Sequence, residues 1–280
     1  ASLEVCFPAS CGFGPAMYSA TLLQAPHKHG VTLDDSCHDR ATVIDTVRNL
    51  GAALRFASEA LRGDREVVLE AVRNNGRALA YASRDLRGDR ELVLEAVRRP
   101  GALEFASAGL RADREVVFEA VRHEGQAFAW ASTELRGDRQ LALEAVRRHG
   151  LSLQWVSEEL RDDRGVIGDA VYNHGGALEF ASVGLRADRE VVLQAVRNHG
   201  QAFAWASAEL RGDRQLALEA VRRHGLSLKW ASEELRRDHE VVRDAICSHG
   251  GALEFASAEL RGDRELALLA IRSFAAGLAC

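Results

Sequence analysis

The apolar residues of this chain follow a helical spacing that restarts every 25 residues. In one unit, an apolar series at i, i+3 and i+4 spacing follows Asp64 and ends before Gly76, which predicts an amphipathic helix over residues 65–75. A second series with helical spacing occupies residues 78–86. Each unit is therefore expected to consist of two short helices joined by tight turns.

Residues with helix-ending chemistry stand at the boundaries of both helices. Asp64 is expected to cap the first helix, because a carboxylate accepts the free N–H groups of the first turn. Gly76 is expected to end that helix in the left-handed conformation, which glycine adopts without steric cost. Arg87 and Gly88 are expected to end the second helix before the next cap, Asp89.

The capping aspartate sets the register of the whole array. It recurs as Asp39, Asp64, Asp89, Asp113, Asp138, Asp163, Asp188, Asp213, Asp238 and Asp263. A short fixed period means that each unit packs mainly on its neighbours. We therefore predict an all-α fold, an alpha solenoid of tandem 25-residue two-helix repeats over residues 39–280, with nine full repeats and a partial tenth.

Two large apolar side chains recur once in every complete repeat. One column is aromatic: Phe56, Tyr81, Phe105, Trp130, Trp155, Phe180, Trp205, Trp230 and Phe255. The other stands two residues earlier: Leu54, Leu79, Leu103, Phe128, Leu153, Leu178, Phe203, Leu228 and Leu253. Apolar stripes on helices are usually core, so both columns are interpreted as packing between layers. Stacking of bases or a cofactor on the tryptophans is the alternative.

Duplication within the array argues against catalysis. Residues 113–187 and 188–262 match without a gap at most positions. Every repeat offers an aspartate and a serine, and many add a histidine, whereas a catalytic centre must be unique. We expect no enzyme activity, no catalytic residues and no cofactor.

Two recurring motifs are attributed to helix ends. Arg-Gly-Asp, as at 62–64, resembles an adhesion tripeptide, but Arg111-Ala112-Asp113 fills the same slot, so helix termination and capping explain it. A histidine precedes the glycine in five repeats: His149, His174, His199, His224 and His249. Layers about 8–10 Å apart are too distant for a metal ladder with bonds of about 2.1 Å. Capping is therefore favoured, and no metal is expected.

Composition limits the classes of partner. The 280 residues are 47% hydrophobic and 28% charged, with a net charge of −5, and no apolar run reaches the ~20 residues of a membrane span. Nucleic-acid binding needs a basic track, which this mildly acidic chain does not show. An RNA or DNA reader that uses one helix pair per base is the less favoured alternative.

The two ends depart from the repeat. Residues 1–38 are expected to form an arm or cap, in which Cys6 and Cys11 are either paired or free thiols. A start at Ala1 suggests a processed organellar protein, with a cytoplasmic protein as the alternative. The apolar C-terminal residues 274–280 suggest truncation or a covered surface.

The repeat also resembles a known family. The pattern over residues 188–196, Gly200 and 206–211 is similar to a short helical-repeat family catalogued as a domain of unknown function in protists and bacteria. The likeness covers roughly residues 39–272. It implies the helical-repeat fold, and it implies no activity.

Variation inside the uniform unit indicates a contact surface. Positions 77, 80 and 84, and their equivalents, vary at i, i+3 and i+7 spacing along the second helix. The candidate partner-binding residues are Gln126, Gln154, Glu158, Glu179, Gln201, Lys229, Glu233 and Glu254. We expect a non-enzymatic scaffold that binds a protein partner or a multi-subunit assembly. An accessory subunit that braces a large organellar complex, photosynthetic or respiratory, is the alternative, and an idle solvated face would explain the same variation.

Overall fold

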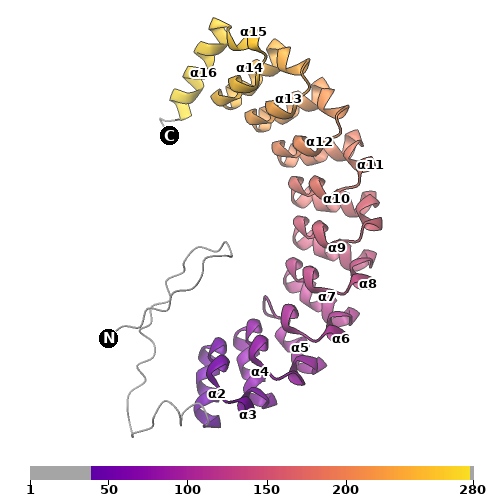
Figure 1. Cartoon of the computed structure of the whole chain (residues 1–280), viewed down its shortest axis with the longest axis vertical. Coiled ribbons are helices and arrows are strands. Elements are labelled where there is room, and N and C mark those ends of the chain that lie inside the picture. The colour runs from indigo at the N-terminus through magenta and orange to yellow at the C-terminus, as the bar shows by residue number, and fades with distance from the viewer. Residues whose placement is uncertain (1–38, 278–280) are drawn as a thin grey trace, which may run out of the picture.

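The computed structural model describes residues 39–277, and all regular structure within that range is helical. Figure 1 shows the repeats stacked side by side in a curved array. Neighbouring α-helices pack along it, as α2 (Arg40–Asn49) does on α4 (Arg65–Asn74), and the 3-10 helices pack on one another in the same way. The predicted all-α solenoid is confirmed.

Each repeat contains three helical segments. The long α-helices are α2, α4, α5 (Arg90–Ala96), α7 (Arg114–His123), α9 (Arg139–Arg148), α10 (Arg164–Asn173), α12 (Arg189–Asn198), α13 (Arg214–Arg223), α14 (His239–Ser248) and α16 (Arg264–Gly277). The 3-10 helices that follow are η2 (Gly51–Phe56), η3 (Gly76–Tyr81), η5 (Leu103–Phe105), η6 (Gly125–Trp130), η7 (Gly150–Trp155), η9 (Gly175–Phe180), η10 (Gly200–Trp205), η12 (Gly225–Trp230) and η14 (Gly250–Phe255). The third segments are α3 (Glu59–Arg62), η4 (Leu86–Gly88), α6 (Ala108–Arg111), α8 (Thr133–Arg136), η8 (Glu159–Asp162), α11 (Val183–Arg186), η11 (Leu210–Gly212), η13 (Leu235–Arg237) and α15 (Ala258–Arg261). The third segments α8 and α11 lie along the convex edge (Figure 1).

The second helix expected over residues 78–86 is divided by an extended residue. η3 ends at Tyr81, and Ala82 has φ −68° and ψ 156°. This conformation lets the backbone N–H of Ser83 donate to the carbonyl of Arg62 in the preceding repeat, at 2.9 Å. The Ser83 hydroxyl then accepts from the N–H of Leu86, at 3.4 Å. The serine thus starts a new short segment and links two repeats.

The apolar core runs along the array between the long α-helices and the 3-10 helices. In one repeat, Val67, Val68, Ala71 and Val72 of α4 and Leu79 of η3 are fully buried. The equivalent residues of other repeats join the same core. Because each unit buries its apolar face against its neighbours, the core has no single centre.

The recurring glycine has a different role from the one predicted. Among the described residues only Gly101 has a positive φ, at 77°, so the left-handed helix ending assigned to Gly76 is wrong. A Cβ on Gly76 would lie 2.8 Å from the carbonyl oxygen of Ala96, and one on Gly150 would lie 2.6 Å from that of Ala170. Glycine is therefore required where the turn approaches the α-helix of the next repeat.

The third repeat, from Asp89 to the residue before Asp113, has 24 residues in place of 25 and is irregular after its first helix. Helix α5 ends at Ala96, and η5 does not begin until Leu103. Pro100 disfavours helical backbone at the residue before it, and Gly101 then turns the chain with its positive φ. The N–H of Gly101 donates to Glu124 of the next repeat at 2.7 Å. The one-residue difference is thus confined to the turn between α5 and η5.

The described array ends on a longer helix. Phe274 occupies the slot that histidine fills in preceding repeats, and its ring meets that of His249 edge-on at 6.0 Å. Ala275 replaces the turn glycine, and α16 continues to Gly277. Leu268, Ile271 and Phe274 are exposed on this helix. None of the helices described between residues 39 and 277 combines the length and apolarity of a membrane span.

Candidate interaction surfaces

All eight predicted partner-binding residues are exposed. Six lie on 3-10 helices: Gln126, Gln154, Glu179, Gln201, Lys229 and Glu254. Glu158 and Glu233 follow Ser157 and Ser232, beyond the break in the second helix. The i+7 relation in one continuous helix therefore does not hold for those two. Whether the set binds a partner stays a prediction.

Five of these residues already contact their own chain, among them Gln154, whose side-chain amide donates to the carbonyl of Leu151 at 3.2 Å. Gln126 and Gln201 reach the Nε2 atoms of His149 and His224 in the next repeat, at 3.1 and 2.9 Å. The ammonium group of Lys229 lies 4.2 Å from the ring centroid of Trp230. Glu233 pairs with Arg237 at 2.5 Å.

The aromatic column is more exposed than predicted. Phe56, Trp130 and Trp205 have exposed fractions of 65%, 40% and 38%, whereas the other six rings are partly buried against the core. The column two residues earlier is buried except for the partly buried Leu253, and Phe128 and Phe203 are inaccessible. In a 3-10 helix, residues i and i+3 lie on one side, so Leu or Phe faces inward and the aromatic residue two positions later is turned towards solvent. The interpretation as packing between layers is therefore correct for the inner column and for the six partly buried rings, and it is wrong for Phe56, Trp130 and Trp205.

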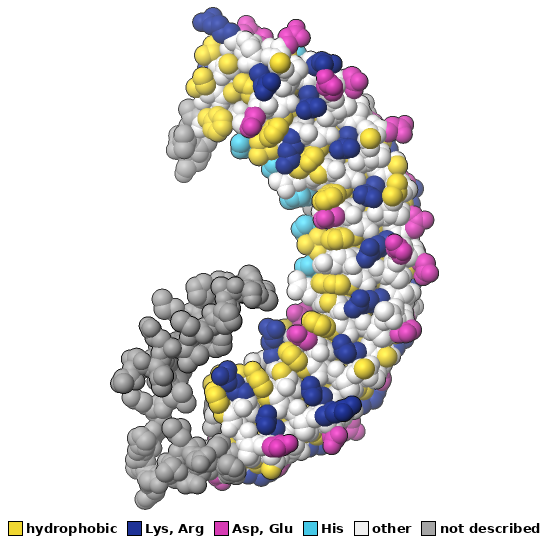
Figure 2. All heavy atoms as spheres, in the orientation of Figure 1, with side chains coloured by type: hydrophobic (Ala, Val, Ile, Leu, Met, Phe, Trp, Pro, Cys, Tyr) yellow, Lys and Arg dark blue, Asp and Glu magenta, His cyan; other side chains and the backbone are white. Residues whose placement is uncertain are grey.

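The histidines line the concave edge of the array, where Figure 2 shows their side chains together. Each recurring histidine ends the long α-helix and precedes the 3-10 helix. The Nδ1 of His249 accepts from the N–H of Gly251 at 3.1 Å, so this side chain caps the 3-10 helix rather than the carbonyls of α14. The rings of His174 and His199 stand 5.9 Å apart. Burial lowers the pKa of His224, and the neighbouring His199 and His249 add to the effect.

An arginine at the start of each of the eight long α-helices from α2 to α13 joins that helix to the cap of the next one. Arg139 Nε lies 2.7 Å from an Asp163 carboxylate oxygen, and Arg214 Nε lies 2.8 Å from Asp238. The aspartates also accept from backbone N–H groups, as Asp238 does from Val241 at 3.1 Å. The hydrogen bond from Arg214 is the largest factor that lowers the pKa of Asp238.

Sequence reasoning missed this arginine ladder. Its members and partners are Arg40–Asp64, Arg65–Asp89, Arg90–Asp113, Arg114–Asp138, Arg139–Asp163, Arg164–Asp188, Arg189–Asp213 and Arg214–Asp238. The available signal was that arginine follows the capping aspartate in every repeat from the first to the eighth. Contact between consecutive repeats explains this regularity.

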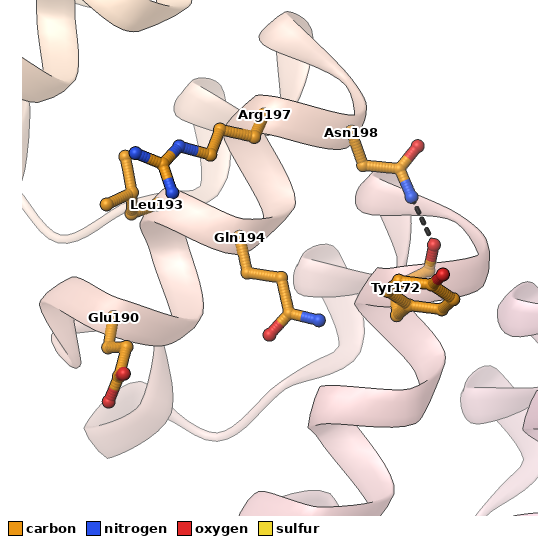
Figure 3. A pocket seen from close by; sticks show the side chains of 6 residues that line it. All are labelled: Tyr172, Glu190, Leu193, Gln194, Arg197 and Asn198. Carbon is orange, nitrogen blue, oxygen red and sulfur yellow. Dashed lines mark hydrogen bonds between the residues drawn. The ribbon is translucent and has the colours of Figure 1, made fainter.

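A shallow groove lies on the exposed side of two long α-helices, α10 and α12. It has a volume of about 640 Å³ and is lined by Tyr172, Glu190, Leu193, Gln194, Arg197 and Asn198. Figure 3 shows these side chains on α10 and α12, with Asn198 donating to the backbone carbonyl of Tyr172. Gly168 stands where most repeats have leucine, and a Cβ there would meet nothing within 4 Å. The missing side chain thus leaves open space.

The groove offers little catalytic chemistry. Its carboxylate, Glu190, is paired with Arg164, and its other polar groups are amides, a phenol and Arg197. Between residues 39 and 277, no three histidine, cysteine, aspartate or glutamate side chains gather into a candidate metal site. Cys247 is a free, exposed thiol. Predictions about residues 1–38 and the pairing of Cys6 with Cys11 lie outside the described residues.

Comparison with known proteins finds the repeat in one family model. The model described as Domain of unknown function (DUF4116) matches residues 39–87, 89–136, 138–186, 188–236 and 238–275. The first four matches each span two of the repeats described above. Neither the curated proteins nor the solved structures include a match to this chain.

Proposed function

Because the chain belongs to this family of unknown function, we propose its role from its surface, as a non-enzymatic scaffold that binds a protein partner. The observation that supports this role concerns the side chains exposed on the 3-10 helices. Exposed variable side chains from Gln126 to Glu254 and the outward-turned aromatic residues lie on these helices in consecutive repeats. Packing does not explain a partly exposed tryptophan, and aromatic residues are enriched where proteins bind one another.

Site-specific photo-crosslinking tests the proposal. A photoreactive residue at Gln154 or Glu179 is expected to crosslink one defined polypeptide in an extract of the source cells. The matched controls are Arg147 and Arg197, which are exposed on the long α-helices and are expected to give no such product. Equal crosslinking from both sets, or none from the first, would contradict the assignment of this surface.

A subunit that braces a larger assembly is the second candidate. It is favoured by the exposed Leu268, Ile271 and Phe274 on α16, because contiguous exposed apolar side chains mark interaction sites. Replacing Ile271 by Glu would then release the chain from the assembly on a sizing column. The surface-scaffold proposal expects the crosslinks from Gln154 to persist in that variant.

A further inference from the structure

In two repeats the chain places its own cation on the outward-turned ring. The guanidinium carbon of Arg55 lies 4.4 Å from the ring centroid of Phe56, and the ammonium nitrogen of Lys229 lies 4.2 Å from that of Trp230. In both cases the cation comes from the residue immediately before the aromatic one. Both distances are within the ~6 Å over which a ring face attracts a cation.

Three of the four tryptophans in this column, Trp130, Trp155 and Trp205, follow an uncharged residue. Ala129 precedes Trp130 and Ala204 precedes Trp205, and these two tryptophans are 40% and 38% exposed. Trp230, beside Lys229, is less exposed. Tryptophan gives the strongest cation–π interaction of the aromatic side chains. Trp155, which follows the neutral Gln154, is also only partly exposed. Trp130 and Trp205 are therefore the two tryptophans of the column that combine an exposed ring with no cation from the preceding residue.

Exposed charge around these rings is mainly negative. In the 3-10 helices, the third segments and the residues that join them, from Gly125 to Gly262, the exposed acidic residues are Glu134, Glu158, Glu159, Asp162, Glu179, Glu209, Glu233, Glu234, Glu254 and Glu259. The exposed basic residues in the same segments are Lys229, Arg237 and Arg261. Five further arginines of these segments are only half-exposed: Arg136, Arg161, Arg186, Arg211 and Arg236. Arg136 donates to the carbonyls of Ala129 and Ala131, and Arg161 donates to those of Gln154 and Val156. This surface is complementary to a positively charged ligand.

We propose that Trp130 and Trp205 bind arginine or lysine side chains of a basic, extended segment of a partner protein, while the surrounding carboxylates attract it. The proposal rests on the scaffold function and specifies its partner. The two rings are three repeats apart, roughly 24–30 Å at the usual spacing of packed helices. An extended segment of about eight or nine residues spans that distance. Nucleic acid would also stack on tryptophan, but these carboxylates would repel its phosphates.

The probe for the direct test is a fluorescein-labelled oligo-arginine peptide of about nine residues, roughly 30 Å when extended. It is titrated with the full chain at low ionic strength, and fluorescence anisotropy is measured. We expect saturable binding that weakens as salt is added, because screening reduces attraction between exposed charges. An oligo-glutamate peptide and a labelled oligothymidylate are expected not to bind.

Variants that place a lysine of the chain itself on each ring separate cation–π binding at the rings from general attraction between charges. The double variant Ala129→Lys with Ala204→Lys reproduces the arrangement at Lys229 and Trp230, and should weaken peptide binding about tenfold if two exposed cation–π contacts are lost. Ala129→Gln with Ala204→Gln reproduces the neutral Gln154 before Trp155 and should leave the affinity within about twofold. The charge control, Thr133→Lys with Ala208→Lys, adds the same charge at exposed positions that follow the two tryptophans. It should weaken peptide binding less than Ala129→Lys with Ala204→Lys does.

Several results would overturn the proposal. Equal losses from the two lysine pairs would mean that charge alone attracts the peptide. No binding of oligo-arginine, or tighter binding of oligothymidylate, would exclude the basic partner. If oligo-arginine fails to bind while Gln154 still crosslinks a defined protein, the scaffold function stands and only the partner chemistry is wrong. If oligo-arginine binds and no crosslink forms, the scaffold function fails instead.

Discussion

Arg214 of one repeat binds Asp238, the residue that caps the first α-helix of the next, with 2.8 Å between Nε and Oδ2. The same carboxylate accepts from the N–H groups of Glu240 and Val241. Helix capping and the link between repeats are therefore made by one side chain. Because the pair recurs along the array, the caps from Asp64 to Asp238 are held in place by the repeat before them.

The first prediction concerns acid stability. The pKa of Asp238 is lowered in the folded state, chiefly by Arg214, so its carboxylate stabilises the fold at neutral pH. That contribution is complete above the unfolded pKa of about 3.9 and is lost as the pH falls through the lower folded pKa. Asp238→Asn should cost about 0.5–1 kcal/mol at pH 7, since asparagine keeps the cap and loses the ion pair.

Denaturant unfolding at several pH values measures this effect. The difference between the variant and the natural chain should shrink as the pH falls below about 3.9, the pKa of the unfolded state, and should disappear below the lower folded pKa, where the folded carboxylate is protonated as well. The control is Glu259→Gln, which changes an exposed acid for which no ion pair is found. A difference for Asp238→Asn that stays constant from neutral to acid pH would contradict the linkage.

The second prediction separates two roles of glycine. Gly150→Ala should destabilise by about 1–3 kcal/mol through overpacking, because its Cβ would lie 2.6 Å from the carbonyl oxygen of Ala170. Gly212→Ala should stay within about ±0.5 kcal/mol, since the nearest atom to its Cβ would be 3.9 Å away. Thermal unfolding followed by circular dichroism compares the two. Equal effects would show that close approach does not select the glycine.

The third prediction compares neighbouring aromatic columns. Phe203 is fully buried, whereas Trp205 is 38% exposed. Phe203→Ala should therefore cost about 3–5 kcal/mol through the cavity it leaves. Trp205→Ala should cost about 1–2 kcal/mol, because roughly a third of its apolar surface gains nothing from folding. Denaturant unfolding measures both free energies of unfolding. A larger loss of stability for Trp205→Ala than for Phe203→Ala would show that the Trp205 ring is part of the core.

The fourth prediction isolates binding from folding. Replacing Gln154, Glu179, Lys229 and Glu254 by alanine removes side chains from exposed positions. Each change should stay within about ±0.5 kcal/mol, and helical content should remain the same by circular dichroism. If these residues contact the partner, the crosslink from Gln126 should be lost in this variant. An unchanged crosslink would place the contact elsewhere.

The sequence by itself determined the period, the fold class and the caps. Asp64 recurs every 25 residues ahead of an apolar helical series, and its carboxylate accepts from Glu66 and Val67 as predicted. Such features depend on residues within one turn of each other, so local chemistry is sufficient to predict them. The inner column represented by Phe203 was predictable for the same reason.

The tertiary structure decided what depends on the neighbouring repeat. The N–H of Ser83 bonds to Arg62 across a repeat boundary, so the second helix divides, and the resulting 3-10 helix turns Trp205 towards solvent. Glycine is needed at position 150 because the backbone of Ala170 in the next repeat lies close to it. Arginine at position 214 pairs with Asp238, the cap of the next helix. The periodic sequence shows that these residues recur at fixed intervals, but it does not show which of them are in contact. Only the distance and angle between adjacent repeats determine those contacts.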